Sequence, residues 1–64
     1  MLGQRIRQLR REKSLTLQQV AQVLGVTRAC VTKWETGLTQ PDLTRLGELA
    51  AVLGLSTGEL VSAA

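Results

Sequence analysis

The sequence predicts an all-α protein built from five short helices in one compact domain, and three observations support this prediction. Apolar residues recur three or four positions apart along most of the 64 residues, which is the spacing of one helix face. Residues that favour helix N-termini and glycines that favour helix C-termini separate these stretches. No segment shows the apolar–polar alternation of a half-buried strand.

Chain length and composition limit how this domain is stabilised. A chain of 64 residues allows one domain, residues 1–64, and a single core of this size rarely supplies more than ~3–5 kcal/mol. The single cysteine excludes an internal disulfide, and the lack of histidine and of paired cysteines argues against a zinc site. We therefore expect capped helices packed on aliphatic side chains, with no metal and no cofactor.

The first helix is expected over residues 2–13. Its buried stripe follows the spacing i, i+4 and i+7 and consists of Leu2, Ile6 and Leu9. Arg10 follows Ile6 by four positions and so leans inward, where a guanidinium needs a carboxylate partner. Glu35 is the candidate partner, which would make a structural ion pair. The other polar residues considered on this helix are expected to be exposed: Arg5, Arg7, Gln8 and Arg11.

The second helix is expected over residues 17–24. Thr16 precedes it as an N-cap, and Gln19 three positions later completes a capping box of the form T-x-x-Q. Gly25 follows the helix and can adopt the left-handed conformation at a sharp corner without the steric cost of a Cβ atom. Ala21 is small enough for a neighbouring helix to pack closely against it.

The third helix is expected between Thr27, its N-cap, and Gly37, which ends it. Val31 and Trp34 are three positions apart and share the face toward the second helix. Trp34 is therefore expected in the core rather than as a stacking platform for a base. Two helices that meet at a sharp corner form a helix-turn-helix, here over residues 17–36.

The fourth and fifth helices follow a loop that contains Pro41. Asp42 is expected to cap the fourth helix, and Gly54 to end it. Ser56 and Glu59 form a second capping box, S-x-x-E, at the start of a short fifth helix. The core face of the fourth helix is predicted to consist of Leu43, Leu46, Leu49, Ala50 and Leu53, and the fifth helix carries Leu60 and Val61.

Charge is distributed unevenly along the chain. Residues 1–36 hold seven basic and two acidic residues, a net charge of +5, whereas residues 37–64 hold one basic and three acidic residues, a net charge of −2. A basic half that contains the helix-turn-helix is typical of a face that binds duplex DNA. Ordinary solvent-exposed arginines on the first helix would give the same pattern, so charge alone leaves both interpretations open.

Few features favour an enzyme. Without histidine, Cys30 lacks its usual base, and no glycine-rich phosphate-binding loop is present. Cys30 is expected to pack as a small residue near the second helix; a redox-sensing thiol is the alternative, but the chain has no second cysteine to resolve it.

No secretory signal or membrane span is apparent, because the longest apolar run, residues 49–55, is far shorter than ~20 residues. We expect a reducing, cytoplasmic environment.

Six short motifs resemble the Cro and phage-repressor type of helix-turn-helix, the xenobiotic-response-element family. They are I-R-x-L-R at 6–10, L-x-L-x-x-V-A at 15–21, L-G-V-T at 24–27, V-T-K-W-E-x-G at 31–37, Pro41, and L-A-x-x-L-G-L at 49–55. The resemblance covers residues 2–60. It implies a five-helix, lambda-repressor-like domain that binds operator DNA, usually as a symmetric dimer, and it also implies the ion pair of Arg10 with Glu35. One departure is Leu17, since this position is often Gln or Ser in the family.

The exposed side of the third helix carries the predicted base-reading residues. Arg28 and Lys33 can donate to guanine O6 and N7, Ala29 can touch a thymine methyl group, and Thr32 can serve a base or a phosphate. Each could instead be an ordinary exposed helix residue. The predicted phosphate-binding residues are Arg10, Gln18, Thr27, Thr39 and Gln40.

These observations favour a sequence-specific transcriptional regulator of double-stranded DNA, bacterial or phage-encoded and nucleoid-associated. We expect a repressor that reads a pseudo-palindrome as a homodimer, with half-sites ~34 Å apart. The dimer surface is expected at residues 59–64, because Val61 would be left exposed on a monomer. The alternative is a protein-interaction module, such as an antitoxin that binds a toxin and its own promoter.

Overall fold

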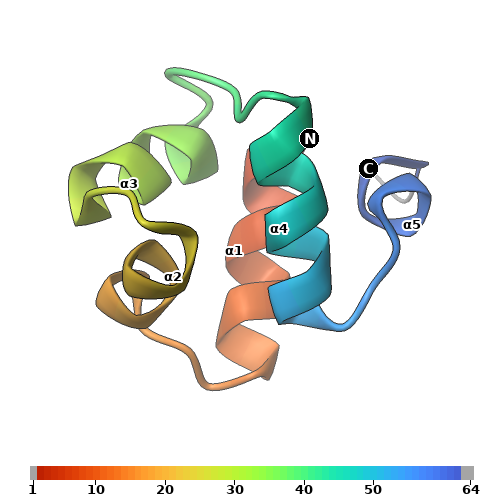
Figure 1. Ribbon diagram of the computed structural model, residues 1–64, viewed down its shortest axis with the longest axis horizontal. Coiled ribbons are helices and arrows are strands. Elements are labelled where there is room, and N and C mark those ends of the chain that lie inside the picture. Colours follow the sequence, from red (N-terminus) through yellow and green to blue (C-terminus); the bar gives the residue numbers. More distant parts are fainter. Residues whose placement is uncertain (1, 63–64) are drawn as a thin grey trace.

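A computed structural model describes residues 2–62; Met1, Ala63 and Ala64 lie outside the described part. Five helices follow one another along the chain and are joined by short connections (Figure 1). They are α1 (Leu2–Glu12), α2 (Leu17–Leu24), α3 (Arg28–Thr36), α4 (Leu43–Leu53) and α5 (Thr57–Ser62). The predicted all-α architecture is confirmed, and α1 ends one residue earlier than expected.

The helices are arranged so that α2 and α3 lie on one flank of α1 and α4, and α5 lies on the other (Figure 1). Helix α1 contacts α3 and α5, α4 contacts α2 and α5, and α2 contacts α3. The helix-turn-helix formed by α2 and α3 is therefore supported from two sides, by α1 behind α3 and by α4 behind α2.

The core is aliphatic and draws on all five helices. Trp34 is 5% exposed and belongs to this core, as predicted from its spacing to Val31. Within residues 2–62, no buried residue is polar or charged. Burying one large aliphatic side chain contributes about 1.5–3 kcal/mol. The buried hydrophobic residues are Ile6, Leu9, Val20, Ala21, Leu24, Val31, Trp34, Leu49, Ala50, Leu53 and Leu60.

Capping interactions define where the helices begin and end. The capping box of Thr16 and Gln19 is formed, with hydrogen bonds of 2.8 and 3.0 Å. The box of Ser56 and Glu59 is formed likewise, at 2.9 and 3.1 Å. In the 2.9 Å bond the Glu59 carboxylate accepts from the backbone of Ser56, and this bond lowers the pKa of the Glu59 carboxyl group. Asp42 accepts a 2.9 Å hydrogen bond from the backbone of Arg45 at the start of α4. Such a cap contributes about 1 kcal/mol.

Two expectations about burial were wrong. Leu43, predicted in the core, is 82% exposed. Its angular position matches that of Ala50, but it lies in the first turn of α4, where no other helix covers it. Arg5, predicted to be exposed, is partly buried, and its Nε atom is fully buried without a hydrogen-bond partner in the described part of the chain. Arg5 lies on the flank of α1 opposite Arg10, so packing against both α3 and α5 narrows the exposed face of α1.

Gly3 allows α1 to approach the last turn of α3 more closely than any other residue would. A Cβ atom at this position would lie 2.6 Å from the backbone oxygen of Glu35 and would also overlap the backbone oxygen of Trp34. Backbone atoms cannot move aside as the end of a flexible side chain can. This close approach fixes how α1 sits against α3, and it was not predicted from the sequence.

Candidate nucleic-acid interface

The corner between α2 and α3 is closed by backbone geometry. Gly25 adopts a left-handed conformation, with φ of 71°, and Val26 donates a 3.0 Å hydrogen bond to the carbonyl of Ala21. Ala21 is buried, as the close crossing of the helices requires. Thr27 then caps α3 by accepting a 3.1 Å hydrogen bond from the backbone of Cys30. These contacts define Arg28 as the first residue of α3.

The four predicted base-reading residues lie together on the exposed side of α3, away from Val31 and Trp34. They are Arg28, Ala29, Thr32 and Lys33. The described residues provide no ion-pair partner for either cation of this group. The hydroxyl group of Thr32 donates a 3.1 Å hydrogen bond to the carbonyl of Arg28, one turn earlier. Two cations without an ion-pair partner, next to a small residue, are suited to the edges of bases in a major groove.

An ion pair connects α3 to α1. Arg10 Nε donates to Glu35 Oε2 at 2.6 Å, and Nη2 donates to Oε1 at 3.2 Å. The third nitrogen, Nη1, donates to the carbonyl of Leu15 at 2.8 Å. The side chains of Arg10 and Glu35 are only 11% and 7% exposed. Arg10 thus holds α3 and the loop before α2 in place, and its contact with a phosphate stays a prediction.

The other four predicted phosphate-binding residues are all exposed and lie near the two ends of α3. Gln18 is the second residue of α2, and Thr27 precedes α3, so both lie near the N-terminal end. Thr39 and Gln40 follow the C-terminal end, in a loop held by a 3.0 Å hydrogen bond from the backbone of Leu38 to the carbonyl of Lys33. The N-terminus of α2 adds a partial positive charge next to Gln18.

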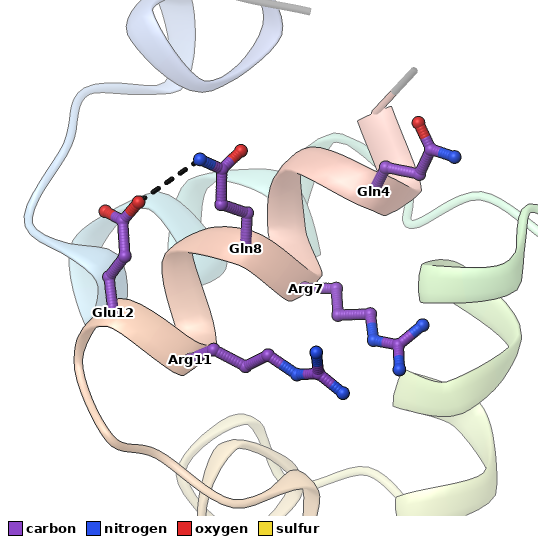
Figure 2. A pocket seen from close by; sticks show the side chains of 5 residues that line it. All are labelled: Gln4, Arg7, Gln8, Arg11 and Glu12. Carbon is purple, nitrogen blue, oxygen red and sulfur yellow. Dashed lines mark hydrogen bonds between the residues drawn. The ribbon is translucent and has the colours of Figure 1, made fainter.

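A groove of about 560 Å³ lies between α1 and α3, and the sequence analysis did not predict it. Figure 2 shows that the side chains of Arg7 and Arg11 extend from α1 toward α3, whereas Gln8 turns the other way and donates a 3.3 Å hydrogen bond to Glu12. The spacing of Arg7 and Arg11, four positions apart, was the signal available in the sequence. The groove is lined by Gln4, Arg7, Arg10, Arg11, Leu17, Thr32, Glu35 and Thr36.

Other kinds of site find no counterpart in residues 2–62. No three residues among the acidic side chains and Cys30 lie close enough together to hold a metal ion. None of the described helices has the length and apolar character needed to span a membrane. Cys30 is a partly buried free thiol that packs against the core.

Comparisons with known proteins agree with this geometry. A family model described as helix-turn-helix matches residues 6–60. The SPbeta prophage-derived regulator YonR of Bacillus subtilis is 39% identical over 61 residues, which cover 95% of this chain and 56% of that protein. This chain thus spans about half of that relative's length.

Two solved structures contain DNA. The structure of SinR, titled as the master regulator for biofilm formation, in complex with DNA is 37% identical, with a TM-score of 0.85, and the match covers 95% of this chain and 98% of that one. The P22 c2 repressor bound to synthetic operator 9T is 25% identical, with a TM-score of 0.92, and the match covers 100% of this chain and 97% of that one.

Proposed function

This chain belongs to the helix-turn-helix family, and we propose from that premise that it is a sequence-specific DNA-binding domain of a transcriptional regulator. The observation that carries the proposal is the exposed row on α3, which consists of two small residues and two cations that have no ion-pair partner in the described chain. The resemblance predicted from the motifs is confirmed, and relatives of the same fold have been solved with DNA.

The proposed interface reads bases with α3 in the major groove. Arg28, at the start of the helix, donates to guanine O6 and N7, and Lys33 reaches the same kind of acceptor from the next turn. Ala29 lets the helix approach closely and contacts a thymine methyl group. Thr32 offers its oxygen, as an acceptor, and its methyl group to a base; a contact with a phosphate would require the hydroxyl group to release the carbonyl of Arg28. Each well-placed base contact is expected to discriminate by ~1–3 kcal/mol.

Contacts with the sugar–phosphate backbone would fix the register of α3. Gln18, Thr27, Thr39 and Gln40, which are all exposed, would donate hydrogen bonds to phosphates near either end of the helix. Arg10 would use only the guanidinium hydrogens that Glu35 and Leu15 leave uncommitted. No metal or cofactor takes part in this mechanism.

The proposed regulator acts as a repressor that binds a pseudo-palindromic operator as a homodimer. Two copies of α3 would then read half-sites ~34 Å apart. The proposed dimer surface is α5, where Val61 is 47% exposed, together with the tail after Ser62, which lies outside the described residues. An apolar side chain on a short terminal helix is suited to a partner helix of the second copy.

Selection from a random duplex pool at moderate salt tests the proposal. Enrichment of an inverted repeat supports specific reading by a dimer, and enrichment of a single short site supports specific reading by a monomer and overturns the dimer. If nothing is enriched while circular dichroism shows a folded protein, operator binding is wrong. The alternative class, a protein-interaction module, then becomes the better hypothesis, and a module that acts only as an adaptor predicts little binding to duplex DNA even at low salt.

A further inference from the structure

Leu17 leaves the start of α2 short of groups that can bind a phosphate. It is the first residue of the helix, is partly buried, and has no hydrogen-bond donor in its side chain. The neighbouring Thr16 and Gln19 side chains are already paired in the capping box. At this end of the helix-turn-helix, α2 therefore offers a DNA strand only one uncommitted polar side chain, that of Gln18.

Arg7 and Arg11 supply positive charge next to this gap. Both are exposed, lie one turn apart on α1, and have no hydrogen bond or ion pair to any described side chain. The groove that they line also contains Arg10 and Glu35, which are paired with each other. The groove thus has a net charge of +2, from three arginines and one glutamate, and this excess belongs to Arg7 and Arg11.

The position of the groove indicates which anion it meets. Its opposite wall is formed by Thr32 and Thr36, one turn apart on α3, and Leu17 closes the end toward α2. Leu17 also lines a second groove, which reaches Gln18 and Arg28 at the start of α3. The two cations therefore lie beside the proposed base-reading helix, and their side chains extend from α1 toward it (Figure 2).

The geometry points to Arg7 and Arg11 as ligands of two backbone phosphates, so that α1 takes over the phosphate contact that Leu17 cannot make. This inference rests on the proposed function. It extends the DNA footprint from the helix-turn-helix to α1 and makes that part of the footprint purely electrostatic, with no dependence on base sequence.

Salt dependence of DNA binding tests the inference with the full chain and the selected duplex. Each phosphate contact contributes about 0.9 to the slope of log affinity against log salt. The R7Q/R11Q variant is therefore expected to reduce the slope by up to ~1.8. Over a tenfold change in salt concentration, the affinity of the variant should then change roughly 60-fold less than that of the unaltered protein. The loss should be equal for selected and scrambled duplexes, and R7K/R11K, which keeps the charge, should retain the slope.

Lys13→Gln is the matched control, because Lys13 lies next to Gly54 at the end of α4 and lines neither groove. It removes one positive charge and should change the slope only slightly. A change in slope per removed charge that is as large in Lys13→Gln as in R7Q/R11Q would show only a general effect of net charge and would overturn the inference, as would an unchanged slope in R7Q/R11Q. If the unaltered protein binds no duplex, the proposed function itself fails, which is a distinguishable result.

Discussion

The helices α1 and α3 beside the proposed interface and the helices α4 and α5 behind it are joined by different kinds of contact. Helices α1 and α3 are joined by the ion pair of Arg10 with Glu35 and by the close backbone contact at Gly3. Helices α4 and α5 pack through fully buried leucines at positions 49, 53 and 60. Their only ion pair in the described chain, Arg45 with Glu48, is local and exposed. All five helices share the apolar core, and directional contacts additionally orient the helices that carry the proposed interface.

The largest effect on stability is expected from a substitution in the core face of α4. Leu49→Ala removes a fully buried side chain and should lower the free energy of unfolding by ~2–5 kcal/mol, comparable to the whole stability of a domain of this size. Urea denaturation measures this loss. Leu43→Ala makes the same chemical change in the same helix at an exposed site and should stay within ~0.5 kcal/mol. Similar losses in both variants would contradict the burial described for α4.

Of the two ion pairs, only that of Arg10 with Glu35 is expected to contribute to the free energy of unfolding. Glu35→Gln leaves the largely buried Arg10 with a neutral partner, and we expect a loss of ~1.5–3 kcal/mol in the free energy of unfolding. Glu48→Gln breaks the exposed pair with Arg45 and should cause no measurable change. A double-mutant cycle with Arg10→Gln checks the coupling. Additive effects of the two substitutions would show that the pair does not hold α1 to α3.

The interface itself should affect binding and leave stability unchanged. Arg28→Ala is expected to cost ~1–3 kcal/mol of affinity for the selected duplex and to relax specificity at one base pair. The melting temperature should not change, because Arg28 is exposed and its side chain makes no ion pair in the described chain. Titrations with duplexes altered at single positions provide the measurement. An equal loss on every duplex would make Arg28 a phosphate ligand.

Two glycine-to-alanine substitutions sharpen the contrast, because their effects on stability are expected to have opposite signs. Gly3→Ala forces a methyl group against the backbone of α3 and should destabilise the domain by ~1–3 kcal/mol. Gly47→Ala places a Cβ atom at an ordinary 3.7 Å from the Thr57 hydroxyl oxygen, within α4, and should stabilise by ~0.4–1 kcal/mol. Thermal unfolding distinguishes the two. Stabilisation by Gly3→Ala would show that α1 and α3 are not in close backbone contact.

Most of the fold could be predicted from the sequence because its signals are local. Thr16, Thr27 and Asp42 mark helix starts through hydrogen bonds that span only three residues, and Gly25 marks a corner through its own backbone conformation. The pairing of Arg10 with Glu35 was also predicted, since an inward arginine has few carboxylates to choose from. This prediction was possible because a guanidinium group that points into the protein needs a carboxylate partner.

The wrong predictions concern burial, which depends on whether another helix packs against a residue. Helical spacing gives the direction in which Leu43 points, but it does not show that the first turn of α4 has no neighbour. The same limit applies to Arg5, which is partly covered because two helices flank α1. Nothing in the sequence distinguishes Gly3 from other glycines in helices, because its close contact is with the backbone of α3. The groove of Arg7 and Arg11 likewise exists only once α1, α2 and α3 are brought together.

The hydrogen bond from Thr32 to the carbonyl of Arg28 has a consequence for which base pair α3 prefers. Because the hydroxyl proton points back into the helix, the oxygen of Thr32 faces outward only as an acceptor. In the major groove, adenine N6 and cytosine N4 present amino donors, whereas guanine O6 and thymine O4 present further acceptors. Within the proposed interface, Thr32 would therefore accept a hydrogen bond from the amino group of adenine or cytosine and disfavour a keto oxygen in the same place.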